Sequence, residues 1–277
     1  MKLIDQSYEI CKTHGYTLRD VYKDIERAAR ISYKSEDKIT EDSAEKMVQH
    51  LIKMKHYSPL EFGTIYLKFD TENNLDVLDK YDYNKFSTIT ITKDSTRYIT
   101  TNYRVIVENH WEDDLQYMCA PTRYHQRRTI VKFITNRAVS HELVRHRSMS
   151  FMQESQRYVA YDKDKFGNEL TFIKPALKQQ ELGKDTNKTT LMSLLFSHIE
   201  DTYMKLRAFG LTPQQARIVL PNATKTELYM CGFDKDWEHF FSLRDVPTVD
   251  PQMYDLIHPL HKDYEETIKS RRETENG

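Results

Sequence analysis

The segment Arg145–Tyr158, with the sequence Arg-His-Arg-Ser-Met-Ser-Phe-Met-Gln-Glu-Ser-Gln-Arg-Tyr, places three basic or potentially basic side chains in a row and a further arginine, Arg157, near its end. The preceding residues 136–144 are predicted to form a short helix, because Val139 and Leu143 are four positions apart and share one face. The basic triplet then lies at or just past a helix C-terminus, where exposed carbonyl groups favour cations. Compensation of the helix dipole needs fewer charges, and arginine binds phosphate or carboxylate through two parallel hydrogen bonds. The segment therefore predicts an anion-binding site.

Composition places the chain among ordinary globular proteins. Its 277 residues allow one large domain or two small ones, and the net charge of −1 gives no overall basic field for nucleic acid. No apolar run approaches the roughly 20 residues of a membrane span. The N-terminus, Met1–Asp5, has no signal-peptide core, so a cytoplasmic protein without a membrane or nucleic-acid partner is expected.

The cysteines and glycines exclude several kinds of site. Cys11, Cys119 and Cys231 are odd in number and scattered, so neither a disulfide framework nor a metal site is predicted. The 7 glycines form no Gly-x-Gly-x-x-Gly or Walker motif. A bound nucleotide would therefore not be held by a Rossmann turn or a P-loop.

The first quarter of the chain predicts two helices and a strand. Helices are expected over residues 18–33 and 41–55 from their apolar stripes, and a strand over 64–69. Between them, Pro59 favours an extended chain at the preceding residue and thus a turn before the strand. Taken alone, His56 and Glu61 in this turn are most simply a loop histidine and a solvated glutamate.

Residues 70–128 are interpreted as a β-containing insertion. A loop or short helix is expected over 70–85, strands over 87–92 and 103–108, and a short helix over 111–117. The basic run 124–128 is assigned to the exposed edge of a following strand at 129–135. A partner-binding surface is an alternative reading of the insertion.

The second half alternates strands and helices. Strands are expected at 157–161, 170–173 and 227–231, and a helix over 189–209 with Gly210 after its end. Thr212, Pro213 and Gln215 form a capping box that starts the next helix. Two further helices are predicted, one starting at Asp234 or Asp236 and ending at Arg244, the other covering 250–272. The pattern indicates a single α+β domain, residues 1–277, with helices packed on a twisted, largely antiparallel sheet.

The order Arg-His-Arg, seven residues, Ser, then Gln-Arg-Tyr resembles the signature of the flavin-dependent thymidylate synthases. Three other segments are similar to that family, namely His-x-Ser-Pro-x-Glu at 56–61, Ala-Arg-x-x-Leu-Pro at 216–221 and Phe-x-x-Leu-Arg at 240–244. The resemblance covers residues 18–69, 129–161 and 205–265.

The resemblance implies roles for individual residues. Those expected at the flavin are His56, Ser58, Glu61, Arg145, His146, Arg147, Gln153 and His239, with the basic triplet offsetting the charge of the reduced flavin. Those expected at the substrate are Glu142, Arg145, Gln153, Glu154, Ser155, Gln156, Arg157, Arg217 and Arg244. Arg244 is the expected catalytic residue, polarising the uracil ring. Glu142 stands where many members have Gln, which leaves open whether it contacts the nucleotide. Arg217, read alone, is an internal ion pair, an apolar stem with its charge at the surface, or a second anion contact.

The resemblance also implies a reaction. The family converts dUMP to dTMP, with methylenetetrahydrofolate as carbon donor, NADPH as reductant and bound FAD as mediator, in a homotetramer with shared active sites. A nucleotide-binding or nucleic-acid-binding protein without redox activity would use the same arginines and is the alternative. A cysteine-dependent thymidylate synthase needs a Pro-Cys-His tripeptide, which this sequence lacks.

Overall fold

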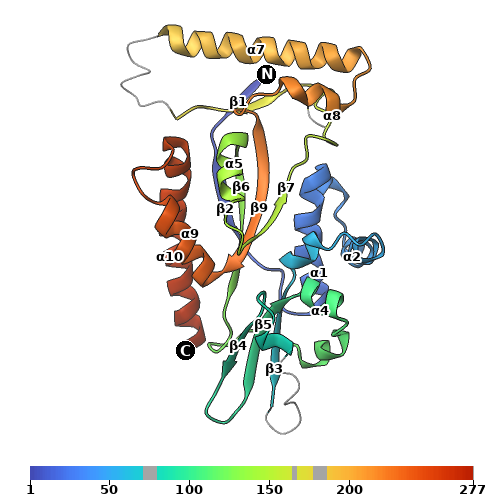
Figure 1. Ribbon diagram of the computed structural model, residues 1–277, viewed down its shortest axis with the longest axis vertical. Helices are drawn as coiled ribbons and strands as arrows, with labels where there is room; N and C mark the ends of the chain where they lie inside the picture. The colour runs from blue at the N-terminus through green and yellow to red at the C-terminus, as the bar shows by residue number, and fades with distance from the viewer. Residues whose placement is uncertain (71–79, 164–166, 177–185, 277) are drawn as a thin grey trace.

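A four-stranded antiparallel sheet in the order β2-β6-β9-β7 lies at the centre of the computed structural model, which describes residues 1–70, 80–163, 167–176 and 186–276 (Figure 1). Its strands are β2 (Ser7–Cys11), β6 (Arg128–Asn136), β9 (Lys225–Phe233) and β7 (Ser150–Gln153). β6 and β9 pair along their full length, and β7 pairs with the other edge of β9. The sheet therefore fixes the middle of the segment 145–158.

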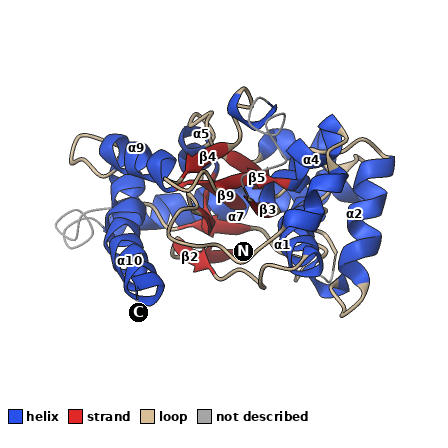
Figure 2. Ribbon diagram, turned by 90° about the horizontal axis from the view of Figure 1, so that it is seen from below, coloured by secondary structure: helices blue, strands red, loops and turns tan. Residues whose placement is uncertain are grey.

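Two helices at the C-terminal end of the chain cover one face of this sheet. They are α9 (Asp234–Arg244) and α10 (Pro251–Asn276), which Figure 2 shows on the side of the strands opposite α1 and α2. Apolar side chains of β6 and β9 pack against Trp237 and Phe240 of α9, and the Trp237 indole donates a hydrogen bond of 3.1 Å to the Thr129 carbonyl. The short helix α5 (Arg137–Leu143) follows β6 directly and buries Val139 and Leu143 in the same core.

A second sheet, in the order β3-β5-β4, packs with the N-terminal helices. Its strands are β3 (Thr64–Phe69), β5 (Arg97–Asn102) and β4 (Thr88–Ile91). Three α-helices surround them, α1 (Leu18–Arg30), α2 (Ser43–Lys53) and α4 (Tyr103–Asn109). The same part of the chain contains the 3-10 helices η1 (Ile31–Tyr33), η2 (Glu36–Lys38), η3 (Ser58–Phe62) and η4 (Glu112–Tyr117).

A third group of elements lies beyond one end of the central sheet (Figure 1). It contains the parallel strand pair β1 (Lys2–Ile4) and β8 (Thr171–Ile173) with α7 (Thr186–Ala208), α8 (Pro213–Ala216) and η6 (Arg217–Val219). The capping box of Thr212 and Gln215 is present at the start of α8, as predicted. Gly210 has a φ of 90°, which suits the predicted glycine after α7.

A group of charged residues, with buried glutamates and partly buried lysines, joins β6 and β9 to the chain after α1. The Glu227 carboxylate of β9 lies 2.7 Å from the Lys34 ammonium and 2.8 Å from that of Lys132, and it also pairs with Lys225. Lys225 in turn lies 3.0 Å from Glu154, which is 3% exposed. Burial opposes ionisation of Glu227, but the three ammonium groups outweigh it and hold its pKa below the ordinary value.

The predicted α+β class is confirmed, with antiparallel pairing throughout both larger sheets and the β1–β8 pair as the parallel exception. Within the described residues, no helix is both long enough and apolar enough to cross a membrane.

Three local predictions were wrong. Residues 103–108 form helix α4, because the Asn102 side chain accepts from the Val105 amide and starts a helix despite the β-branched composition. Residues 157–161 form no strand, and residues 150–153 of the same segment pair with β9 instead. The run 124–128 is not an exposed edge, because His125 and Arg128 are buried. The single-domain and insertion readings remain predictions, and residues 71–79, expected as part of a loop or short helix, lie outside the described part.

Candidate functional site

The segment 145–158 extends from the end of α5 to the turn at Tyr158, and its consecutive residues contribute to two different cavities. Met152, Ser155 and Tyr158 line one of them, which we call the first cavity. Gln156 lines the other, the second cavity. Because Ser155 donates its backbone N–H to the Ser32 carbonyl after α1 at 3.2 Å, the turn is fixed where the two cavities approach each other.

The first cavity has a volume of about 850 Å³ and lies between the segment, α2 and the turn 54–59. It contains the predicted flavin residues His56 and Ser58 together with Ser155. Its walls include an aromatic pair, Tyr33 and Tyr158, whose ring centroids are 4.9 Å apart. Both rings are more than half exposed and available to a ligand.

The second cavity has a volume of about 810 Å³ and is basic. Arg217, predicted as a second anion contact, lines it beside Gln156 and Gln214, and is exposed. The Arg157 guanidinium donates from Nε to the Gln214 side chain at 3.1 Å, so Arg157 lies at the same cavity. Neither arginine has a carboxylate within 4.0 Å among the described residues, which leaves both charges for a ligand.

Arg244 lies apart from both cavities, in a cluster with two residues of the α5 end. Its Nη1 donates to the Glu142 carboxylate at 2.6 Å, and its Nε donates to Nε2 of His146 at 3.1 Å. Arg244 and Glu142 are only partly buried. The Glu142 carboxylate is thus an ion-pair partner of Arg244.

His146 is a neutral acceptor in this cluster, which corrects the expectation that it contributes positive charge. Burial, together with the positive charges of Arg244 and His239, lowers the pKa of His146 to about 4. Its ring also contacts Phe240 edge-on, with centroids 4.8 Å apart. At neutral pH its Nε2 lone pair therefore orients the Arg244 guanidinium.

Three other predicted site residues have partners inside the protein. Gln153 donates to the Ser140 and Thr226 hydroxyls, and Glu154 is paired with Lys225. Glu61 lies 2.6 Å from Arg104, a residue that lines the first cavity. Glu61 and Gln153 are only partly buried, whereas Glu154 is buried and faces a separate small cavity beside β1.

Arg145, Arg147 and His239 are exposed and line neither of the two cavities. The sequence interpretation missed Arg137 and His141, which line the second cavity from α5, and Tyr33, which lines the first. The sequence could have indicated that Arg137 and His141 act together, because residues four positions apart share one face of a helix.

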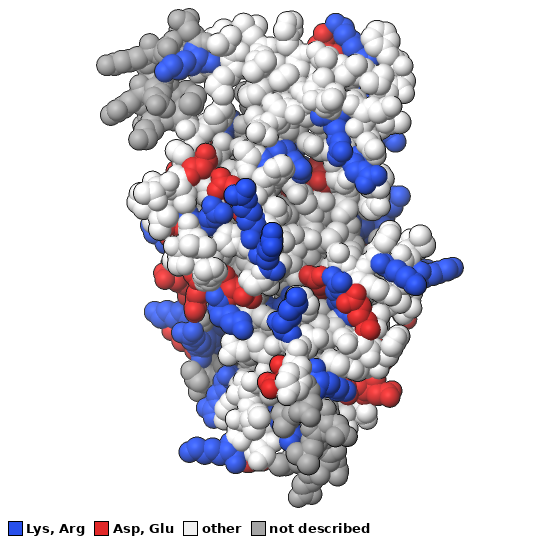
Figure 3. All heavy atoms as spheres, in the orientation of Figure 1, with Lys and Arg blue, Asp and Glu red and all other residues white. Residues whose placement is uncertain are grey.

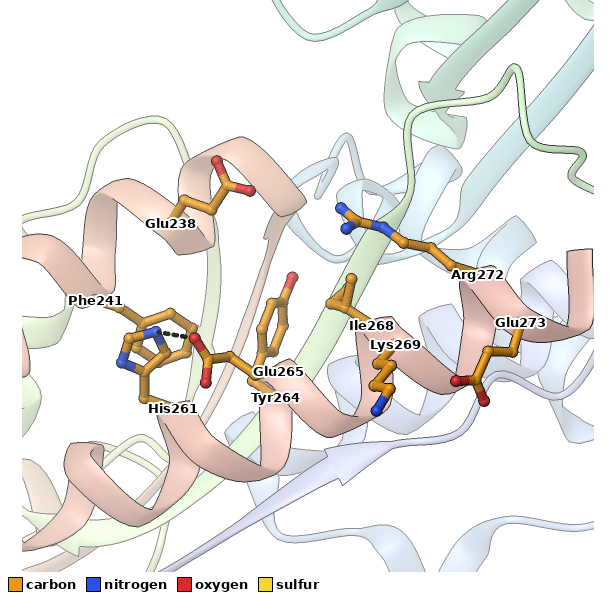
Figure 4. Close-up of a pocket in the computed structure, with 9 residues that line it drawn as sticks. All are labelled: Glu238, Phe241, His261, Tyr264, Glu265, Ile268, Lys269, Arg272 and Glu273. Carbon is orange, nitrogen blue, oxygen red and sulfur yellow. Dashed lines mark ion pairs between the residues drawn. The ribbon is translucent and has the colours of Figure 1, made fainter. Parts of the chain in front are cut away.

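A further cavity of about 750 Å³ lies between α9 and α10 (Figure 4). Its lining contains Glu238, Glu265 and Glu273 as well as Lys269 and Arg272, so its charges are mixed. None of the predicted site residues lines it. Mixed charge is also visible on the face shown in Figure 3, where basic and acidic side chains lie side by side.

The three cysteines lie outside both main cavities. Burial raises the pKa of Cys11 to about 11 and also raises the pKa values of Cys119 and Cys231. A raised thiol pKa lowers the thiolate fraction, so none of them has the character of a nucleophile.

The fold and the two cavities define an α+β protein whose polar pockets gather arginine, serine and aromatic side chains. A family model described as "Thymidylate synthase complementing protein" matches residues 16–125 and 125–266. The chain belongs to this family, and the resemblance to the flavin-dependent thymidylate synthases is confirmed.

Similar proteins carry matching names. A flavin-dependent thymidylate synthase of Geobacter sulfurreducens is 33% identical over 109 residues, 39% of this chain and 44% of that protein. One from Corynebacterium aurimucosum is 32% identical over 130 residues, 44% of this chain and 51% of that protein. The chain thus matches about half the length of these relatives. A solved structure of a UMP/dUMP methylase, PolB from Streptomyces cacaoi, bound with 5-Br dUMP, has 16% identity and a TM-score of 0.44, covering 96% of this chain and 93% of that one.

Proposed function

We propose that this protein is a flavin-dependent thymidylate synthase that converts dUMP to dTMP, with methylenetetrahydrofolate as carbon donor and NADPH as reductant through bound FAD. Family membership supports the proposal. The observation that carries it is the turn 155–158, whose neighbouring residues contribute to two cavities of different chemistry. A reaction between a cofactor and a nucleotide needs two such sites in contact.

The first cavity suits a flavin nucleotide. Tyr33 and Tyr158 offer aromatic surface for a planar ring, and the Ser58 and Ser155 hydroxyls offer hydrogen-bond donors for phosphate oxygens. Its volume lies in the upper part of the range of about 300–1,000 Å³ that is usual for ligand sites. FAD, when bound there, would supply the redox chemistry, while the protein supplies orientation and field.

The second cavity suits the phosphate of dUMP. Arg157 and Arg217 bring two guanidinium groups without carboxylate partners, and Gln156 and Gln214 bring amide donors. The phosphate is already dianionic in the free nucleotide. Contacts to it would therefore bind substrate and transition state alike and would lower KM rather than raise turnover.

Arg244 has the properties of the group that acts on the uracil ring. Glu142 and His146 hold its guanidinium from two sides, so its remaining N–H donors have a fixed direction. Negative charge develops on the uracil carbonyl as C5 becomes nucleophilic, and a donor fixed in advance stabilises that charge.

We further propose that the active site is shared between copies in a homotetramer. Arg244, Arg145 and Arg147 line neither cavity of their own chain, and two of them are exposed. If all three act on the same ligands as Arg157, they are supplied by a neighbouring copy.

An absorption spectrum of the purified protein, followed by a dTMP assay with all substrates, tests the proposed function. We expect flavin absorption that changes on addition of dUMP, and dTMP formation that requires methylenetetrahydrofolate and NADPH. A folded protein that binds dUMP but neither contains nor takes up FAD would favour the alternative of a nucleotide-binding protein without redox activity.

A further inference from the structure

A small cavity of about 320 Å³ lies between the end of β2, the start of β6 and α10, and it shares no lining residue with the first or the second cavity. Four cationic residues line it, contributed by three separate parts of the chain: Lys12, Arg127, Arg128 and Arg271. No aspartate or glutamate is among its lining residues. The cavity in Figure 4, on the other side of α10, differs in its charges, because three glutamates lie beside its two basic residues.

Neutral groups accept hydrogen bonds from two of these cations. Arg128 is 7% exposed and donates to the Glu61 carbonyl at 2.8 Å and to the Thr64 hydroxyl at 3.2 Å. Arg271 donates to the Thr129 hydroxyl at 2.8 Å. Within the part of the chain that the structure describes, Lys12, Arg128 and Arg271 have no carboxylate within 4.0 Å.

Asp234 is an acidic group beside the cavity, and it is already engaged. It accepts a hydrogen bond of 2.7 Å from the Tyr264 hydroxyl. Burial raises its pKa, against the opposing effects of Tyr264, Arg271 and Thr129. Four cations and no carboxylate line the cavity, which gives its wall an excess of positive charge in a chain whose net charge is −1. Clustered cations repel one another, and a bound anion would relieve that repulsion.

Two tyrosines give the cavity an aromatic wall. Tyr66 is buried, and the Arg127 guanidinium lies 5.6 Å from its ring centroid. Tyr16 is 41% exposed at the rim, with its ring centroid 6.0 Å from that of Tyr66 in an edge-to-face arrangement. The exposed face of Tyr16 is thus free to contact a planar group that enters beside the cations.

We propose that this cavity binds a small aromatic phosphate ester, whose phosphate contacts Lys12 and Arg271 and whose ring packs on Tyr16. The cavity volume is at the lower end of the range for ligand pockets, about 300–1,000 Å³. The cavity is therefore too small to enclose a whole dinucleotide. This site is separate from the proposed dUMP site, because it shares no lining residue with the second cavity.

Calorimetric titration of the full chain with phenyl phosphate tests the proposal, with two variants on α10 as a matched pair. Arg271→Gln removes a cation of this cavity, whereas Arg272→Gln removes the adjacent cation, which faces the cavity of Figure 4. We expect Arg271→Gln to weaken binding by about 10- to 100-fold, the usual effect of losing one charge-assisted hydrogen bond. Arg272→Gln should stay within about twofold of the parent protein, since it loses no contact to the ligand.

Further variants separate this site from the proposed function and from a folding defect. Lys12→Gln, at an exposed position, should weaken binding without changing thermal stability. Arg157→Gln should leave unchanged the phenyl phosphate binding that Arg271→Gln weakens, even if dTMP synthesis and phosphate binding in the second cavity are lost. Tyr16→Leu should remove the preference for phenyl phosphate over inorganic phosphate. Binding that is lost in Arg157→Gln, or equal in the Arg271 and Arg272 variants, would overturn the proposal.

Discussion

At the scale of single residues, Arg244 is the side chain whose surroundings say most about its role. It ends α9, and it is held by a carboxylate and a neutral imidazole that both come from the end of α5. A guanidinium that is fixed before the substrate arrives needs no reorganisation during the reaction. Arg157, in contrast, is exposed and bonded to one amide oxygen.

Replacement of these two arginines should therefore have different kinetic effects. Arg244→Ala is expected to lower turnover by roughly 100- to 1000-fold, or about 3–4 kcal/mol, because one preorganised donor is lost. Its dUMP affinity should remain within about tenfold of the parent, whereas Arg157→Ala should lose mainly affinity. Flavin spectral titration with dUMP and turnover at saturating dUMP separate the two effects. Normal turnover in Arg244→Ala once it is saturated would show that the roles are assigned wrongly.

His146 should make the stability of the protein depend on pH. Its folded pKa of about 4 lies below the ordinary value of 6.5. As the pH falls through this window, the unfolded state takes up a proton that the folded state does not, so the free energy of unfolding decreases. His146→Gln should flatten this dependence in urea unfolding measured between pH 7 and pH 4. His198→Gln, an exposed residue of α7, is the control and should leave the slope unchanged.

At the scale of elements, Asp245 joins the end of α9 to α10. Its two carboxylate oxygens accept from His258 at 2.8 Å and from His261 at 2.7 Å. Burial alone would raise the pKa of Asp245, but these two contacts outweigh it and hold the pKa below the ordinary value. The contribution of Asp245 to the free energy of unfolding is therefore fully present above its ordinary pKa, and it is lost as the pH falls from there through the lower pKa of the folded state. Because Asp245 follows Arg244 directly, the contact also positions the catalytic candidate.

Asp245→Asn should loosen this junction. We expect a loss of about 1–3 kcal/mol in the free energy of unfolding at neutral pH, the usual range for hydrogen bonds to a charged group. Turnover should fall while dUMP affinity changes little, since the phosphate contacts are elsewhere. Chemical unfolding and steady-state kinetics measure both effects. Asp255→Asn, an exposed position of α10, should change neither, and equal behaviour of the two variants would contradict the positioning role.

Elements determined by local chemistry were predictable from the sequence, and those determined by distant contacts were not. The capping box at Thr212 uses residues within one turn, and the helix after it begins where expected. Residues 103–108 have strand-like composition, yet β5 ends at Asn102 and its side chain starts a helix. The strand predicted at 157–161 is absent, and residues 150–153 pair with β9 as β7 instead. Composition does not record which segment pairs with a given sheet edge.

At the scale of the whole molecule, the site depends on pairs far apart in the chain. Glu142 and Arg244 are separated by 102 positions, and Arg157 and Gln214 by 57. The family motifs named most of these residues, but no motif states that His146 is neutral or that Glu142 is paired. Those properties depend on burial and on neighbours that only the folded chain brings together.

Mixing two impaired variants tests whether copies share an active site. Arg157→Ala and Arg244→Ala are unfolded, combined and refolded, and dTMP formation is measured at a dUMP concentration far below that which saturates Arg157→Ala. We expect activity to recover, because a mixed assembly would contain pockets with both arginines intact if they come from different copies. Affinity tags of two kinds confirm that mixed assemblies form. Mixed assemblies without activity would mean that both arginines of one pocket belong to the same chain.

The buried charges around Glu227 constrain how this protein can be redesigned. Loss of one member leaves uncompensated charge in the interior, which typically costs about 3–5 kcal/mol. Replacement of an entire buried ion group by apolar residues of similar volume is often neutral or stabilising. In protein design, these five residues should therefore be changed together: Lys34, Lys132, Lys225, Glu154 and Glu227. Mutant libraries that vary these positions one at a time will contain mostly unstable variants. Libraries that vary all of them together can contain stable variants in which apolar side chains replace the charged group.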